Sequence, residues 1–230
     1  MNKLKILSIG ACVALCMVFA LFENDEPNDC EQIKDESGIS IEQEVDLGLP
    51  SGTIWAGWNV GASTPEQFGG YYAWGETEEK SDYTWETYRY WVDRNGDGDM
   101  DSNEITNIGT NISGTQYDVA RQKWGGSWRM PTKAEIDELD SKCSWTWYQY
   151  KGVWGQKVTG PNGNSIFLPA AGKRTGTSLF DDGSGYYGSA TLNEGFDGSS
   201  VWRLCFYNRY SGGSVSSCIR NSGLTVRPVK

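Results

Sequence analysis

The sequence predicts an α+β domain in which two short helices precede a series of antiparallel strands. One observation is a clear helix start at Thr132, where Thr132 and Glu135 form a capping box ahead of the apolar residues Ile136 and Leu139. The other is the composition, with 29 Gly, 11 Trp and 12 Tyr in 230 residues. Many glycines together with many large aromatic rings are typical of short strands joined by tight turns.

Both predicted helices lie in the middle of the chain. The first is expected over residues 118–123, because Gly125 and Gly126 end the pattern there. The second begins at Thr132, directly after Pro131. Because both are short and amphipathic, we expect them to pack against the rest of the domain.

Strands are expected on both sides of the helices. Alternating apolar residues mark the strands, and clusters of Gly, Pro, Asn or Ser mark the turns between them. The Gly- and Ser-rich residues 172–200 are expected to hold little regular structure. The predicted strand regions are residues 45–62 (a hairpin that turns at 50–52), 69–76, 145–147, 158–169 (two strands joined at 161–164), 201–207, 215–220 and 224–229.

The ionisable residues exclude several classes of function. The 30 Asp and Glu residues against 20 Lys and Arg give a formal net charge of −10, which disfavours nucleic acid as a partner. The chain contains no histidine. Ser-His-Asp and Cys-His catalysis, a histidine general base and histidine-ligated zinc are therefore excluded.

The N-terminus is typical of an export signal. Lys3 and Lys5 form a basic start, an uncharged apolar run follows over residues 6–22, and an acidic stretch comes next. Residues 1–22 therefore predict a signal peptide, and a cleavage site fits after Ala20. An uncleaved anchor and a lipoprotein are the alternatives. The protein is expected to be exported, either to the cell envelope, at the outer-membrane surface, or as a secreted protein.

The mature chain divides into a tether and one domain. Residues 23–42 are polar, acidic and poor in aromatic residues, which predicts a flexible tether. Residues 43–230 carry the turn and strand patterns and are expected to form the domain. The sequence predicts no oligomeric state.

Four cysteines follow the export signal, in a compartment where disulfides form. They allow three complete pairings. Cys205 and Cys218 lie symmetrically about residues 210–213 of an expected hairpin, which favours a Cys205–Cys218 disulfide. Cys30 and Cys143 either pair with each other or stay free.

Residues 93–104 match the EF-hand calcium loop at every diagnostic position. Oxygen ligands are expected at the first, third, fifth, ninth and twelfth positions, a carbonyl ligand at the seventh, and glycine at the sixth. The segment that follows is not helical, so we expect one isolated structural Ca²⁺ rather than a paired sensor. The alternative is a solvated acidic turn. The predicted ligands are Asp93, Asn95, Asp97, Asp99 through its carbonyl, Asp101 and Glu104.

Six segments, in order, resemble the Fibrobacter succinogenes major paralogous domain family, and the resemblance extends over about residues 45–230. The resemblance implies a C-type-lectin-like fold in a secreted or surface protein of a Bacteroidetes-type bacterium, with no defined activity. Gly188 lies where family members often have tryptophan. The calcium loop is an insertion between the second and third segments. The six segments are residues 45–63, 71–76, 117–139, 158–172, 185–191 and 222–229.

The same superfamily includes formylglycine-generating, sulfatase-modifying enzymes, to which residues 128–139, 205–210 and 222–228 are also similar. Their chemistry requires two neighbouring redox cysteines near the C-terminus. Cys205 has no cysteine a few residues further on, and the next one is Cys218. A structural disulfide therefore explains this pair better than an enzymatic site.

The predicted function is a cell-surface binding or adhesion module whose ligand is a glycan or a protein. Trp154, Tyr186 and Tyr187 lie beside Gly-rich stretches and are the candidate surface rings for ligand binding. One alternative is a carboxylate-based hydrolase, with residues 181–182 or Glu76 as candidate acids together with Glu78 and Glu79. Another is a purely structural envelope protein.

Overall fold

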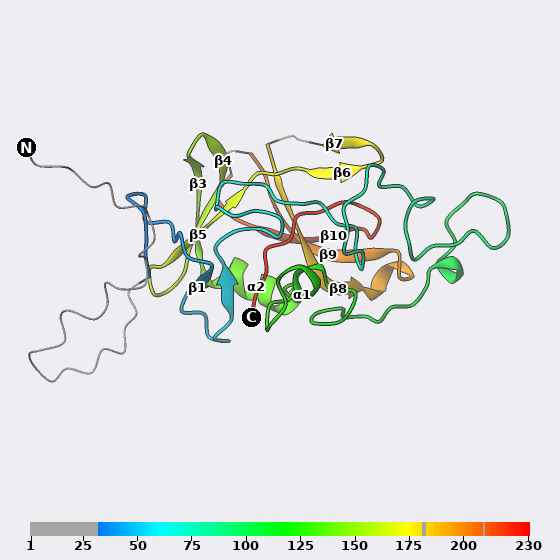
Figure 1. Cartoon of the computed structure of the whole chain (residues 1–230), viewed down its shortest axis with the longest axis horizontal. Coiled ribbons are helices and arrows are strands. Elements are labelled where there is room, and N and C mark those ends of the chain that lie inside the picture. Colours follow the sequence, from blue (N-terminus) through cyan, green and yellow to red (C-terminus); the bar gives the residue numbers. More distant parts are fainter. Residues whose placement is uncertain (1–31, 181–182, 209) are drawn as a thin grey trace, which may run out of the picture. The chain divides into compact units, whose positions relative to one another are not determined.

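The computed structural model describes residues 32–180, 183–208 and 210–230, and it has the predicted α+β class. Antiparallel strands form two three-stranded and two two-stranded sheets (Figure 1). The helices are α1 (Val119–Trp124) and α2 (Lys133–Lys142), with 3-10 turns η1 (Ser102–Glu104) and η2 (Glu194–Phe196). The strands are β1 (Glu44–Asp46), β2 (Ile54–Ala56), β3 (Ser144–Tyr150), β4 (Val153–Thr159), β5 (Ser165–Pro169), β6 (Lys173–Thr175), β7 (Ser178–Phe180), β8 (Gly185–Asn193), β9 (Ser200–Phe206) and β10 (Ser214–Ile219).

Local sequence signals explain both helices. The Asp118 carboxylate caps α1 by accepting hydrogen bonds from the amides of Ala120 and Arg121. Both halves of the predicted capping box are present at α2, where Thr132 and Glu135 each accept from the other's backbone amide. The helix predictions are therefore confirmed.

Helix α2 packs on one face of the sheet ordered β10–β9–β8, and the β6–β7 hairpin lies over the other face (Figure 1). The helix buries Ile136 and Leu139 in the largest hydrophobic cluster, which also contains Trp55, Tyr187 and Phe206. The apolar stripe predicted from the sequence is thus the face that packs on the sheet.

Several strand predictions are confirmed. The first hairpin is β1–β2, and its turn is closed by a hydrogen bond of 2.9 Å from the Gly52 amide to the Leu49 carbonyl. Strands β4 and β5 pair as the second predicted hairpin, and β9 and β10 cover the expected C-terminal regions.

Other strand predictions are wrong. Residues 172–200 contain β6, β7 and β8 rather than irregular chain. Gly185 shows why, because a Cβ there would come within 2.1 Å of the Phe206 ring. The small residue permits close packing of paired strands instead of interrupting them. Residues 69–76 and 224–229 are not regular strands, since they pair with each other only at the Tyr72–Leu224 bridge.

The domain begins earlier than residue 43, because the described end of the predicted tether packs on the fold. Ile39 is buried, the Ser40 amide donates to the Ser165 carbonyl at 2.9 Å, and the Tyr150 hydroxyl donates to Asp35 at 2.5 Å. The rest of the predicted tether and the predicted signal peptide lie outside the described residues. Within the described part of the chain, no helix is long and apolar enough to span a membrane.

The expected Cys205–Cys218 disulfide is not formed, and both residues are free thiols, as is Cys143. In the β9–β10 pair Cys205 lies opposite Ser214, and Cys218 lies opposite Val201, so the two cysteines are four residues out of register. The turn between the strands is not centred where the cysteine spacing suggests. Cys30 lies outside the described residues.

Candidate functional site

One face of the β3–β4 hairpin carries a row of three tryptophans. Strand alternation places Trp145 and Trp147 of β3 on the same face as Trp154 of β4. The rings of Trp145 and Trp147 both lie 6.4 Å from the Phe206 ring, centroid to centroid. The row thus begins at the hydrophobic core and ends at Trp154, whose side chain is 48% exposed.

A tight turn sets the position of the two outer tryptophans. Tyr150 pairs with Val153, so only Lys151 and Gly152 connect the strands, and both have positive φ angles of 46° and 87°. Such a turn fixes the register of a hairpin. The register makes Trp147 and Trp154 diagonal neighbours, stacked with their ring centroids 5.8 Å apart and their planes 5° apart.

A pocket of about 300 Å³ lies beside this stacked pair. Its described lining consists of Trp147, Trp154, Gly183 and Asn208. The Asn208 amide packs against Gly183, since a Cβ on Gly183 would lie 3.1 Å from Asn208 Nδ2. Two aromatic residues and one amide side chain therefore border the same pocket.

Hydrogen bonds hold the β9–β10 loop against the tryptophan hairpin. The Gln156 side-chain amide donates to the Tyr210 carbonyl at 2.6 Å, and the Trp147 amide donates to the Ser211 hydroxyl at 3.4 Å. The side chain of Gln156 is buried beside Trp154 on the same strand face. These contacts position Asn208 relative to the tryptophans.

The described lining of this pocket suits ligand binding. Ligand sites combine apolar walls with a few placed polar groups, and this pocket offers two indole rings and an amide. None of its described lining residues is titratable. The combination fits a ligand with one apolar face and hydroxyl groups at its edge.

The other two candidate rings, Tyr186 and Tyr187, are not at the surface. Their side chains are only 4% and 2% exposed. The Tyr187 hydroxyl donates to the Pro169 carbonyl at 2.7 Å, and its ring stacks on Phe206. Burial raises the pKa of the Tyr187 hydroxyl far above its ordinary value. The prediction that these two rings face a ligand at the surface is therefore wrong, because β8 packs between the core and the β6–β7 hairpin.

Trp147 and Asn208 were not among the residues predicted to bind ligand. The alternation of Trp145 and Trp147 and the Lys151-Gly152 turn together contain the signal for a Trp147–Trp154 pair. Nothing local in the sequence brings Asn208 to this hairpin, because that contact joins distant segments.

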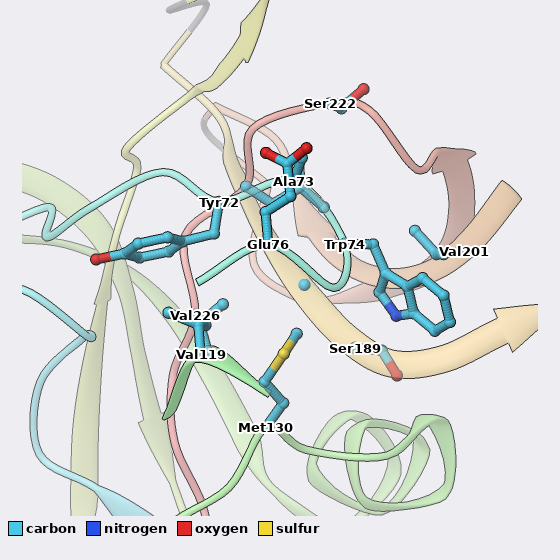
Figure 2. Close-up of a pocket in the computed structure, with 12 residues that line it drawn as sticks. Tyr72, Ala73, Trp74, Glu76, Val119, Met130, Ser189, Val201, Ser222 and Val226 are labelled. Atoms are coloured by element: carbon cyan, nitrogen blue, oxygen red, sulfur yellow. The ribbon is translucent and has the colours of Figure 1, made fainter. Parts of the chain in front are cut away.

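A second cavity lies inside the domain and is part of its packing (Figure 2). Its volume is about 10 Å³, which leaves room for about one water molecule. Met130 and Val226 border it from one side, and the carboxylate of Glu76 points away from them (Figure 2). A cavity of this size does not admit an organic ligand.

The predicted calcium loop follows Trp91 and Val92, and some of its expected ligands lie close together. Asn95 Nδ2 lies 2.9 Å from an Asp97 carboxylate oxygen and 3.3 Å from an Asp101 oxygen. Both Asp93 oxygens accept from amides of the loop itself, and the Asp99 side chain is exposed. Within the described residues, no three acidic, cysteine or histidine side chains are grouped so that they could hold a metal ion as they are.

The carboxylates of the hydrolase alternative make structural contacts. Glu76 pairs with Lys80 at 2.9 Å and accepts from the Arg89 amide, Glu78 pairs with Lys123, and Glu79 accepts from the Tyr71 amide. Residues 181–182 lie outside the described part of the chain.

Comparison with known protein-family models, with characterised proteins and with solved structures found no match.

Proposed function

We propose that the protein is an exported surface-binding module whose ligand is a glycan. The ligand binds in the pocket beside Trp147 and Trp154. The proposal includes the C-type-lectin-like fold and the envelope location that the family resemblance and the N-terminal sequence imply. The observation that carries it is the stacked tryptophan pair, in which Trp154 is 48% exposed.

The chemistry of the pocket favours a sugar ring over other small ligands. One face of many pyranose rings presents only C–H groups, which pack on an indole face, and the ring edge presents hydroxyls. Asn208 offers a donor and an acceptor for such hydroxyls. A pocket of about 300 Å³ is at the small end of the range for ligand sites, which suits one or two sugar units.

The local structure supports a rigid site. Trp147 and Trp154 lie on paired strands of a hairpin with a two-residue turn, and hydrogen bonds fix the neighbouring loop. Rings that are already held in place lose little freedom on binding, so modest contacts give useful affinity.

A glycan array tests the proposal, using the labelled full chain and the Trp154→Ala variant. The parent chain is expected to bind a defined set of glycans, and Trp154→Ala to lose that binding by about tenfold or more. Phe196→Ala is the matched control, because Phe196 is 55% exposed and does not line the pocket. Absence of any bound glycan, or equal binding by Trp154→Ala, would overturn the proposal and leave a protein partner as the better hypothesis.

A further inference from the structure

The loop of residues 93–104 carries an unbalanced charge. It holds five carboxylates and one basic residue, Arg94. Within the described residues, none of these carboxylates pairs with a lysine or arginine side chain, and the Arg94 guanidinium donates to the Asn103 carbonyl. Like charges so close together in the chain repel one another, and a bound cation would relieve this repulsion.

The buried carboxylate of Glu104, at the end of the loop, independently points to a bound cation. Its side chain is directed into the loop, where Oε1 accepts from the amides of Arg94 at 2.6 Å and Asn95 at 3.2 Å. The residue is only 2% exposed, and Oε2 is buried with no hydrogen-bond partner. A buried carboxylate oxygen without a donor is costly, so a positively charged group is expected beside it.

Three of the other expected ligands lie close together. Asn95 already lies between Asp97 and Asp101, and its amide nitrogen occupies a place between two carboxylates. The Asp93 oxygens face the amides of Gly96 and Gly98 at 2.6 and 3.1 Å. Rotation of the Asn95 amide would exchange its NH₂ group for an oxygen, which is the ligand type that Ca²⁺ prefers.

We propose that residues 93–104 bind one Ca²⁺, with Glu104 as the buried ligand that closes the site. The expected ligands are all oxygens, and the loop contains no cysteine or histidine, so the site would select a hard cation. This proposal is independent of glycan binding, because none of these residues lines the tryptophan pocket.

Bound Ca²⁺ would also stabilise the segment that joins the loop to the domain. Trp91 and Ile105 form a bridge, and the Thr106 amide donates to the Tyr90 carbonyl at 2.7 Å. Trp91 packs in a cluster with Tyr88, whose hydroxyl accepts from Arg220 at 2.6 Å. The cation would hold the two ends of the loop at this connection.

Two neighbouring aspartates allow a matched test on the full chain. Asp97 and Asp99 are both exposed, but the loop pattern uses the carboxylate of Asp97 and only the carbonyl of Asp99. After EDTA treatment, the parent and the Asp97→Asn and Asp99→Asn variants are titrated with Ca²⁺, and the thermal midpoint is followed. We expect the parent and Asp99→Asn to be stabilised, and Asp97→Asn to require about tenfold or more Ca²⁺.

The Glu104→Gln variant distinguishes a cation site from a buried carboxylate that only destabilises the fold. In EDTA this variant is expected to be at least as stable as the parent, because a neutral amide replaces the buried charge. In Ca²⁺ it should lose the stabilisation that the parent shows. Stabilisation of Glu104→Gln by Ca²⁺ equal to that of the parent would overturn the proposal.

Two further readouts do not depend on stability. Tb³⁺ in the loop should emit when the tryptophans are excited, because Trp91 lies two residues before the loop, and Ca²⁺ should quench this emission by competition. Trypsin cleavage after the exposed Arg94 should slow in Ca²⁺ for the parent and Asp99→Asn, but not for Asp97→Asn. Absence of both Tb³⁺ emission and Ca²⁺ protection in the parent would contradict a cation site.

Discussion

Two aromatic pairs of this protein look alike in the sequence and lie in opposite environments. Trp147 and Trp154 stack across a hairpin and extend from the core to solvent, whereas Tyr186 and Tyr187 are adjacent in β8 and are buried on both of its faces. Tyr187 faces the main core, and Tyr186 lies beneath Lys173 and Arg203. An aromatic residue beside glycine therefore indicates tight packing as readily as an open surface.

The largest loss of stability is expected from a change in the buried tyrosine pair. Tyr187→Ala removes a ring that stacks on Phe206 and a hydroxyl that bonds Pro169. We expect it to lower the free energy of unfolding by about 3–5 kcal/mol. Urea unfolding followed by circular dichroism measures this, and a loss under about 1 kcal/mol would show that the ring is not part of the core.

Tyr187→Phe has a smaller effect that depends on pH. At pH 7 the loss of the hydroxyl removes one of the hydrogen bonds to the Pro169 carbonyl, which still accepts from the Ala171 amide at 2.9 Å, and should cost about 1 kcal/mol. Burial raises the pKa of the Tyr187 hydroxyl in the folded state. The un-ionised tyrosine therefore contributes stability below its unfolded pKa of about 10, and this contribution is lost as pH rises further.

The free energy of unfolding, measured between pH 7 and pH 11, tests whether this stability is lost as pH rises. The parent should lose stability more steeply above pH 10 than Tyr187→Phe does, so the two curves should approach each other. Parallel curves over this range would mean that the phenol ionises as readily in the folded protein as in the unfolded chain.

The exposed pair should show a still smaller effect on stability. Trp154→Ala removes a half-exposed ring that packs mainly on Trp147, and we expect a loss of about 1 kcal/mol or less. The same urea experiment measures it. A loss as large as that of Tyr187→Ala would mean that Trp154 is a packing residue and would remove the contrast between the two pairs.

The smallest effect is expected from reduction of the protein. Cys205 and Cys218 are free thiols on the sheet beneath the β6–β7 hairpin, so dithiothreitol should leave the thermal midpoint unchanged. Burial raises the pKa of the Cys218 thiol to about 11, which also slows its alkylation in the folded protein. Peptide mapping after iodoacetamide treatment measures this, and a Cys205–Cys218 cross-linked peptide would contradict the register described above.

Features set by nearby residues could be predicted from the sequence. The Thr132–Glu135 capping box, the caps of α1 and the β1–β2 turn each depend on residues within a few positions, and they are where the sequence places them. The α+β class follows from the same local signals.

Features set by contacts between distant segments could not be predicted from the sequence. The pairing of Cys205 depends on where the β9–β10 turn falls, and symmetry about the glycines does not determine that position. The burial of Tyr186 depends on its cover by the β6–β7 hairpin, which lies in a region expected to be irregular. The pocket itself needs Asn208 beside the β3–β4 hairpin, and only the folded chain shows that contact.

The most direct test of the tryptophan site observes the indole groups themselves. The full chain, labelled with ¹⁵N at its 11 tryptophan side chains, is titrated with the glycan that binds best on the array. Trp147→Phe and Trp154→Phe assign the two indole signals of the site. We predict that these two signals shift together with one binding constant while the other indoles stay in place. Shifts confined to other tryptophans, with Trp147 and Trp154 unchanged, would contradict a ligand site at this pair.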